Sequence, residues 1–399
     1  MMLIEFEQSA MGFQHSLILK QDGSVWATGS NKFGQLGDGS TMDKRNFADV
    51  LSSGAKAVTA GWWHSLVLKQ DGSVWATGSN QDGQLGDGSN NKRSSFVQVI
   101  ASGVQAISAG GHHSLVLKED SSVWATGWNP NGQLGDGSNA DRNSFRMVIS
   151  DGAKAVAAGT EHSLVLSRGG SVWATGGNHQ AQLGDGSRSN RNNFVRVFSG
   201  DAKAVAAGGF HTIVLKQDGS VWATGDNHDG QLGLSSYTDR LTFAKVLSGG
   251  VEAIAAGFKH SLVLKQDGTV WTTVSTKSTN NLRVISSTFV EVVTSGAKAV
   301  VAGRSSSLVF KQDGSLWAKG KNYAGQLGEG SQSFQSGFVR VAQVRNGTKG
   351  TTESTVETSS GPETTNSGKN YVARYIINRI NRVCMHESMK TQTEIIRTT

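Results

Sequence analysis

The chain has 399 residues, including 51 glycines, two prolines and ten tryptophans, and its formal net charge is +7. So much glycine excludes a helical bundle, and the lack of a strict three-residue period excludes collagen, which leaves short strands joined by tight turns. The mild positive charge favours an acidic partner only slightly. The single cysteine, Cys384, excludes an intramolecular disulfide and favours a reducing compartment.

The N-terminal residues MMLIEFEQSAMG predict a strand rather than a targeting segment. They contain no basic region, and Glu5 and Glu7 interrupt the apolar run, so we expect no signal peptide. No apolar run in the chain reaches the roughly 18 residues that a membrane span needs. We therefore expect a cytoplasmic protein, with the nucleus as the alternative compartment.

From His15 onward one pattern recurs seven times, built around a WATG motif or a close variant of it. The first five spacings of its tryptophan are 49 residues and the last is 46, which is the period of a repeat architecture. A histidine precedes the tryptophan by eleven residues, except in the seventh copy, where Ser306 stands instead. We assign structural roles to both sets, the tryptophans Trp26, Trp75, Trp124, Trp173, Trp222, Trp271 and Trp317 and the histidines His15, His64, His113, His162, His211 and His260.

Each copy predicts four short strands, as in the segments FVQV at 96–99, VQAISAG at 104–110, HSLVLK at 113–118 and SVWATG at 122–127. Their alternating faces are typical of strands, and the Asp-Gly turn of most copies is a strong hairpin signal. A single blade cannot bury both of its faces, so seven such units must close into a ring. The sequence predicts an all-β fold, a seven-bladed β-propeller of four-stranded blades over residues 1–345.

The two ends of the repeat predict how the ring closes. The last copy ends at GFVRVAQV without an AKAVAAG strand, whereas LIEFEQSAMG supplies such a strand before the first copy. We expect the ring to be closed by the N-terminal strand, which would complete the blade formed by the C-terminal copy.

The remaining residues differ in composition from the repeats. Residues 346–370 are rich in Thr, Ser and Gly without periodicity and predict a disordered linker. Within the tail of residues 371–399, YVARYIINRINRV predicts a short basic helix, but its arginines do not gather on one side. The alternatives are a helix that binds a partner or membrane surface and an incidental tail.

The segment AGGHHSLVLKEDSSVWATGWNPNGQLGDGS at 109–138 resembles the regulator of chromosome condensation repeat. The similarity lies in the G-x-x-H turn, the hydrophobic strand, the hairpin turn, the tryptophan and the N-x-x-G-Q-L-G loop, and it runs through all seven copies. Copy six departs most, since TTVSTKSTNN replaces the loop. The resemblance implies a seven-bladed propeller that binds proteins. The founding member of the family exchanges guanine nucleotides on a small GTPase and binds chromatin, but many members do neither.

The stretch GWWHSLVLKQDGS at 61–73 contains the residue types of a hydrolytic triad, yet it predicts no active site. His64 and Ser65 are strand neighbours and point to opposite faces, while Asp71 lies in the turn at the far end of the strand. We expect each histidine to bond backbone near its G-x-x-H turn. One histidine per blade is too sparse to share a metal ion. The glycines of GQLGDG lack the Lys-Ser/Thr of a phosphate-binding loop. We therefore expect a non-enzymatic protein without catalytic residue, metal or cofactor.

The connections between strands sort onto two faces of the ring, and one of them holds most differences between copies. This variable face carries the G-x-x-H turns and the N-x-x-GQLG loops, whereas the opposite face, with the QDGS and SGAK turns, is nearly uniform. A repeat can recognise a particular partner only where it varies, and aromatic residues and arginine anchor interfaces. The alternative is neutral variation at exposed turns. Our candidates for partner binding are Phe13, Trp62, Trp63, His112, Phe210, Phe258 and Arg304.

A basic residue follows the tryptophan by 18 positions in five adjacent copies, at Lys44, Arg93, Arg142, Arg191 and Arg240. An arc of positive charge could attract an acidic protein or a nucleic acid. Bracing of the neighbouring loop is the interpretation that we favour.

Together these patterns predict a monomeric scaffold that binds a protein partner through its variable face. The alternatives are a guanine-nucleotide exchange factor for a small GTPase, which rests on the resemblance alone, and a regulator associated with chromatin or nucleic acid.

Overall fold

The structure is a computed structural model, and it describes residues 6–273 and 288–341. These residues form seven four-stranded antiparallel sheets. In this part of the chain no helix is long and apolar enough to cross a membrane. The predicted linker at 346–370, the tail at 371–399 and almost all of the altered loop of copy six lie outside the described residues.

Each sheet is one blade made of four strands that follow one another in the sequence. Blade 1 is β1 (Phe6–Met11), β2 (His15–Lys20), β3 (Val25–Gly29) and β4 (Lys44–Leu51). Blade 2 is β5 (Ala55–Ala60), β6 (His64–Lys69), β7 (Val74–Gly78) and β8 (Arg93–Ile100), and blade 3 is β9 (Val104–Ala109), β10 (His113–Lys118), β11 (Val123–Gly127) and β12 (Arg142–Ile149). Blade 4 is β13 (Ala153–Ala158), β14 (His162–Ser167), β15 (Val172–Gly176) and β16 (Arg191–Phe198), and blade 5 is β17 (Ala202–Ala207), β18 (His211–Lys216), β19 (Val221–Gly225) and β20 (Arg240–Leu247). Blade 6 is β21 (Val251–Ala256), β22 (Ser261–Lys265), β23 (Val270–Thr273) and β24 (Phe289–Val293), and blade 7 is β25 (Ala297–Ala302), β26 (Ser306–Lys311), β27 (Leu316–Gly320) and β28 (Gln335–Arg340).

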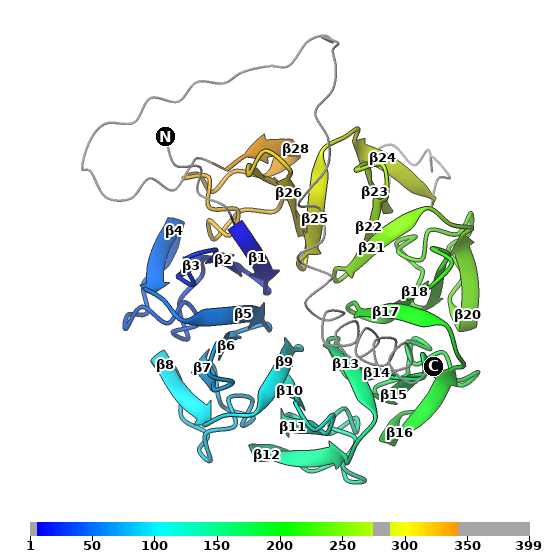
Figure 1. The fold of residues 1–399 in the computed structure, drawn as a ribbon, viewed down its shortest axis with the longest axis horizontal. Helices are drawn as coiled ribbons and strands as arrows, with labels where there is room; N and C mark the ends of the chain where they lie inside the picture. Colours follow the sequence, from blue (N-terminus) through cyan, green and yellow to red (C-terminus); the bar gives the residue numbers. More distant parts are fainter. Residues whose placement is uncertain (1–5, 274–287, 342–399) are drawn as a thin grey trace, which may run out of the picture. The chain divides into compact units, whose positions relative to one another are not determined.

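The blades stand side by side in a ring, with the first strand of each blade next to the central axis and the fourth strand at the periphery (Figure 1). Neighbouring inner strands contact one another all the way round, including β1 against β25. The predicted seven-bladed β-propeller is therefore confirmed.

The closure of the ring differs in one respect from the prediction. β1 does lie where the first and last blades meet, but it pairs with β2 of its own blade, with Met11 opposite Ser16. The C-terminal copy supplies all four strands of blade 7 by itself. The expected exchange of a strand between the ends was wrong because the peripheral FVRV strand is the last of its blade and not the first. The tight G-x-x-H turn also keeps β1 beside β2.

The hairpin between the second and third strands is held by a recurring set of side chains. In blade 2, Asp71 accepts bonds from Ser73 N and Ser73 Oγ, and Ser73 Oγ accepts the Trp75 Nε1 proton at 3.0 Å. The ammonium of Lys69 lies 4.0 Å from the centroid of the Trp75 ring, a cation–π contact. We call this set the hairpin lock. The indole bond recurs in every blade except blade 4, at Trp26, Trp75, Trp124, Trp222, Trp271 and Trp317.

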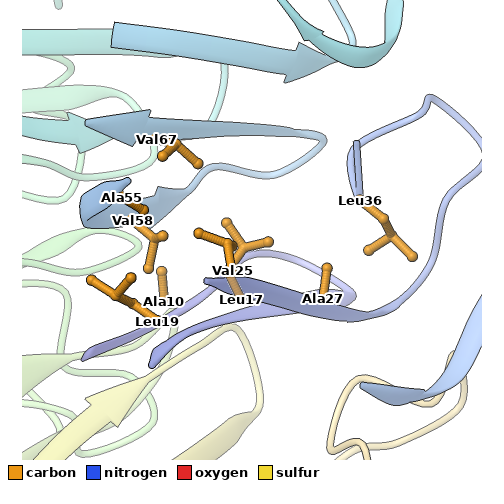
Figure 2. Packing of buried hydrophobic residues seen from close by; sticks show 9 residues of the cluster. All are labelled: Ala10, Leu17, Leu19, Val25, Ala27, Leu36, Ala55, Val58 and Val67. Carbon is orange, nitrogen blue, oxygen red and sulfur yellow. The ribbon is translucent and has the colours of Figure 1, made fainter. Parts of the chain in front are cut away.

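The hydrophobic core lies between blades rather than within them. Figure 2 shows one cluster, in which Leu17, Leu19 and Val25 of blade 1 face Ala55 and Val58 of blade 2. All of these side chains are fully or almost fully buried. Because each blade buries its faces only against its neighbours, the ring is expected to fold as one cooperative unit.

Candidate functional site

The histidines of the G-x-x-H turns form hydrogen bonds with hydroxyl side chains of the next blade. His15 Nε2 lies 2.9 Å from Ser65 Oγ of the next blade, and Ser65 Oγ donates its proton to the backbone oxygen of Gln35 at 2.7 Å. The equivalent pairs are His64–Ser114, His113–Ser163, His162–Thr212, His211–Ser261 and His260–Ser307. The expected bond to nearby backbone was wrong, since the partner is a hydroxyl 50 residues away.

This geometry is unsuited to hydrolysis. A hydroxyl has one proton, and Ser65 gives it to a carbonyl oxygen, so the histidine donates to the serine and cannot act as its base. Burial lowers the pKa of His15, His113 and His162 to about 3, which keeps the rings neutral. As expected, His64 and Ser65 do not bond each other, and Asp71 bonds only within its own turn. The histidines and serines therefore belong to the joints between blades, and Asp71 belongs to the hairpin lock.

Within the described ranges, one group of side chains has the ligand atoms of a metal site, namely Asp226, His228 and Asp239. His228 Nδ1 lies 2.6 Å from Asp226 Oδ1, and Arg188 pairs with Asp239 at 2.9 Å. Because a guanidinium already neutralises one of the two carboxylates, the group is explained by its own ion pairs.

Four of the five basic residues that follow the tryptophan by 18 positions form ion pairs with an aspartate of their own blade. Arg93, Arg142 and Arg191 pair with the aspartate of the preceding GQLGDG loop at 2.6, 2.7 and 2.8 Å, and Lys44 pairs with Asp38 at 3.2 Å. The same aspartates accept bonds from the loop asparagine, as Asp87 does from Asn80. Blade 5 has Leu234 at the aspartate position. In the part of the chain that the structure describes, Arg240 accordingly has no carboxylate partner.

The central channel is narrow, and its lining combines small residues with Phe13, Trp62, Phe258 and Arg304. Six blades contribute an Ala-Gly pair and blade 1 contributes Met11-Gly12, and the volume is about 80 Å³. Such a space holds a few water molecules and no larger ligand. Any recognition at the axis must therefore take place at the mouth of the channel and not inside it.

Aromatic side chains gather at that mouth, on the variable face. The Phe13 ring centroid lies 5.5 Å from that of Trp62 and 4.7 Å from that of Trp63, and Trp62 lies 5.1 Å from His112. Trp62 also lies 6.3 Å from Phe258, so blades 2 and 6 contact each other across the axis. We define the mouth cluster as Phe13, Phe33, Trp62, Trp63, His112, Trp128, Phe210, Phe258 and Arg304.

Arg304 places a positive charge within the mouth cluster. Its guanidinium carbon lies 3.7 Å from the Phe13 ring centroid and 5.4 Å from that of Phe258, which is cation–π geometry. Gly209 leaves room for Phe258, because a Cβ there would lie 2.8 Å from its ring. Within the described residues no carboxylate pairs with Arg304. The cluster therefore combines half-buried aromatic surface with an uncompensated charge.

A second set of variable residues links neighbouring turns around the cluster. In blades 2, 3, 4 and 6 the second variable residue of the G-x-x-H turn contacts the loop residue 30 positions earlier, and each link has its own chemistry. His112 bonds Asp82 at 2.9 Å, Lys259 pairs with Asp229 at 2.8 Å, and Asn131 donates to Glu161. The differences between copies thus include matched pairs, not only isolated changes.

The seven candidates from the G-x-x-H turns all lie in the mouth cluster, whereas the five basic residues do not. The sequence prediction missed Phe33 and Trp128 as members. Trp128 contacts His112 at a ring separation of 6.3 Å, and Phe33 contacts Trp63 at 5.4 Å. Comparison of the copies would have found Trp128, because the residue after the WATG motif in the other complete copies is small or charged, namely Ser30, Ser79, Gly177, Asp226 or Lys321.

Solved structures with the same fold share little sequence with this chain. Yeast RCC1 (Prp20), in a crystal structure with Kap60 bound, has a TM-score of 0.71 and 18% identity, covering 86% of this chain and 86% of that chain. Human WBSCR16 has a TM-score of 0.70 and 22% identity, covering 80% of this chain and 93% of that one. A comparison with curated proteins found no match.

Two models of the regulator of chromosome condensation (RCC1) repeat match the sequence. The matched residues are 8–35, 55–84, 104–133, 153–182, 202–231 and 251–273 for one model, and 22–68 and 71–117 for the other. With seven blades and this repeat in most of them, the chain belongs to the regulator of chromosome condensation repeat family.

Proposed function

We propose that this propeller is a non-enzymatic scaffold that binds a protein partner through the mouth cluster. The observation that carries the proposal is the concentration of large aromatic side chains and one unpaired guanidinium at the axis of an otherwise repetitive ring. Tryptophan, tyrosine and arginine supply most of the binding energy in protein interfaces.

The chemistry of the cluster indicates the kind of partner. Half-buried rings such as Trp62 and Phe258 still expose part of their surface and gain free energy when a partner covers it. Arg304 would then need a carboxylate, since an unpaired buried charge is unfavourable. We therefore expect the partner to present an apolar residue next to an acidic one.

The test is affinity capture with mass spectrometry, using the full chain and the variant Trp62→Ala, Trp63→Ala, Phe210→Ala. We expect this variant to lose the partner while its thermal unfolding remains cooperative. The matched control is Met147→Ala, Leu241→Ala, Phe334→Ala, which removes three exposed apolar side chains outside the mouth cluster. Equal capture by both variants would contradict the proposal.

A second candidate function is guanine-nucleotide exchange on a small GTPase. Yeast Prp20p, which has a TM-score of 0.65 and 19% identity, is described with binding properties toward Gsp1p and histones. The rate of nucleotide release from a panel of small GTPases tests this function. If the protein at micromolar concentration accelerates none of them, this candidate function is excluded.

Binding to chromatin or nucleic acid is a further alternative, and it predicts a steep loss of affinity with salt. Four of the five arc residues are already paired with aspartates, which weighs against this alternative. Action in the cytoplasm or the nucleus fits each of these functions.

A further inference from the structure

Blade 4 lacks the hairpin lock that the other blades share. Its turn reads SRGGS, so Ser167 stands at the lysine position and Gly169 at the aspartate position. Ser167 Oγ bonds the backbone of Ser171 instead. Without an aspartate to orient it, the Ser171 hydroxyl does not accept the Trp173 indole proton, and that proton has no acceptor among the described residues.

As a result Trp173 is the most exposed tryptophan of the ring, with 37% of its surface accessible. In blades 3, 5 and 6 the equivalent tryptophan packs against the core between blades, as Trp124 does. The corresponding core between blades 3 and 4 contains Val148, Ile149 and Phe194 but not Trp173. A cavity of about 370 Å³ lies there, lined by these side chains and by Trp173.

The cavity also contains a carboxylate at a position where no other blade has an acidic residue. Asp151 lines the cavity, whereas the equivalent residues are Ser53, Ser102, Gly200, Gly249 and Ser295. No cation among the described residues pairs with Asp151. In five other blades a lysine ammonium lies between 3.6 and 4.7 Å from the tryptophan ring centroid. Blade 4 has therefore lost its cation and gained a negative charge in the cavity that the uncovered ring lines.

We propose that the cavity between blades 3 and 4 binds a primary ammonium group on an apolar stem, with Trp173 and Asp151 as its recognition residues. The ammonium takes the place over the indole that lysine occupies elsewhere, and Asp151 supplies the opposite charge. Val148, Ile149 and Phe194 cover the stem. The site lies away from the mouth cluster and does not depend on the proposed partner binding.

The experiment follows the indole N–H resonances of the full chain by NMR, with the Trp173 signal identified by its loss in Trp173→Phe. The probes are phenethylammonium chloride, the uncharged 2-phenylethanol, and Nα-acetyl-lysine-N-methylamide. We expect phenethylammonium to shift the Trp173 signal saturably and to bind about three- to fivefold more tightly than the alcohol. The Trp124 signal, which belongs to a locked blade, serves as internal control and should not shift. A shift with the capped lysine assigns the site to lysine side chains of a protein, and its absence assigns it to free amines.

Two variants separate recognition from folding. Asp151→Asn should weaken phenethylammonium binding about threefold and leave 2-phenylethanol unchanged. Ser167→Lys with Gly169→Asp rebuilds the lock of the other blades, and a Cβ at Gly169 meets nothing nearer than Ser167 Oγ at 4.0 Å, so folding should be preserved. This double variant should lose at least about tenfold in affinity, because its own lysine covers Trp173. Equal binding of the alcohol and the amine, or undiminished binding by the double variant, would overturn the proposal.

Discussion

The joints between blades and the mouth of the channel use the same repeat in opposite ways. At the joints the copies are alike, and the buried link from histidine to hydroxyl to glutamine carbonyl recurs in the five joints from His15 to His211, while His260 bonds Ser307. At the mouth, the two residues that precede this histidine position form a different pair in each blade, as Trp62, Thr160 and Arg304 show. Residues that recur hold the ring together, and residues that differ are the ones available for recognition.

The joint between blades 7 and 1 differs from the other joints. Ser306 replaces the histidine there, so Ser16 receives no imidazole and only donates to the Gln326 oxygen at 2.7 Å. Thr28 Oγ1 still donates to the Gly325 oxygen at 2.9 Å. Among the residues that the structure describes, the ring is thus closed by fewer buried polar bonds at this joint than at the five joints from His15 to His211, and β1 contacts β25 across it.

Removal of residues 1–11 is the change with the largest expected effect. It deletes the inner strand of blade 1, including the buried Ala10 and Met11, and leaves the inner strands β5 and β25 without the strand between them. We expect a loss comparable with the whole free energy of unfolding, roughly 5–15 kcal/mol, seen as loss of the cooperative thermal transition. Removal of residues 1–5, which precede β1, is the control. An unchanged melting temperature after the longer deletion would contradict this role of β1.

Mild acid should destabilise the joints between blades. Burial lowers the pKa of the joint histidines, to about 3 for His15 and His211 and to about 4 for His260. The unfolded chain, with histidine pKa near 6.5, takes up these protons first. Stability is therefore complete above pH 6.5 and falls as the pH decreases toward the folded values, by about 1.4 kcal/mol per pH unit for each histidine. His228 affects the pH dependence of stability in the opposite direction, because its hydrogen bond with Asp226 raises its pKa. It is one group against six joint histidines, so the net effect of acid remains a loss of stability.

Guanidinium unfolding at pH 7.0 and pH 5.5 measures this dependence. The variant His113→Gln removes one titrating ring and should lose about 1.2 kcal/mol less stability between these two pH values, because the full slope applies only below pH 6.5. A pH-independent midpoint over this range would mean that the histidines are not the groups that respond.

The sequence predicted the blades well because each strand and turn is specified by residues within one copy, such as the Asp-Gly turn and the alternating strand. It did not predict which strand begins a blade, because a closed repeat has no intrinsic start. The serine partner of each histidine was also missed, since it lies in the next blade. The mouth residues were found because they vary, but the contact of Trp62 with Phe258 across the axis required the ring itself.

Two serine substitutions compare the regular joint with the exceptional one. Ser65→Ala removes both bonds of the hydroxyl and leaves His15 Nε2 and the Gln35 oxygen buried without partners. Ser16→Ala removes only the bond to the Gln326 oxygen. We expect Ser65→Ala to cost about 2 kcal/mol more in the free energy of unfolding, measured in urea. Equal costs would show that the histidine link contributes nothing to the joint.

The smallest expected effect distinguishes a braced loop from an unbraced one. Arg142 pairs with Asp136 at 2.7 Å and also donates to Ser138, whereas Arg240 follows Leu234 in place of an aspartate. Arg142→Gln should therefore lower the free energy of unfolding by about 0.5–1 kcal/mol, and Arg240→Gln should leave it unchanged. The free energy of unfolding of both variants is measured at low and at high salt. High salt should reduce only the effect of Arg142→Gln, because it screens the ion pair with Asp136. If Arg240→Gln alone also weakened partner capture, Arg240 would belong with the recognition residues, and blade 5 would mark where a bracing position has become free for binding.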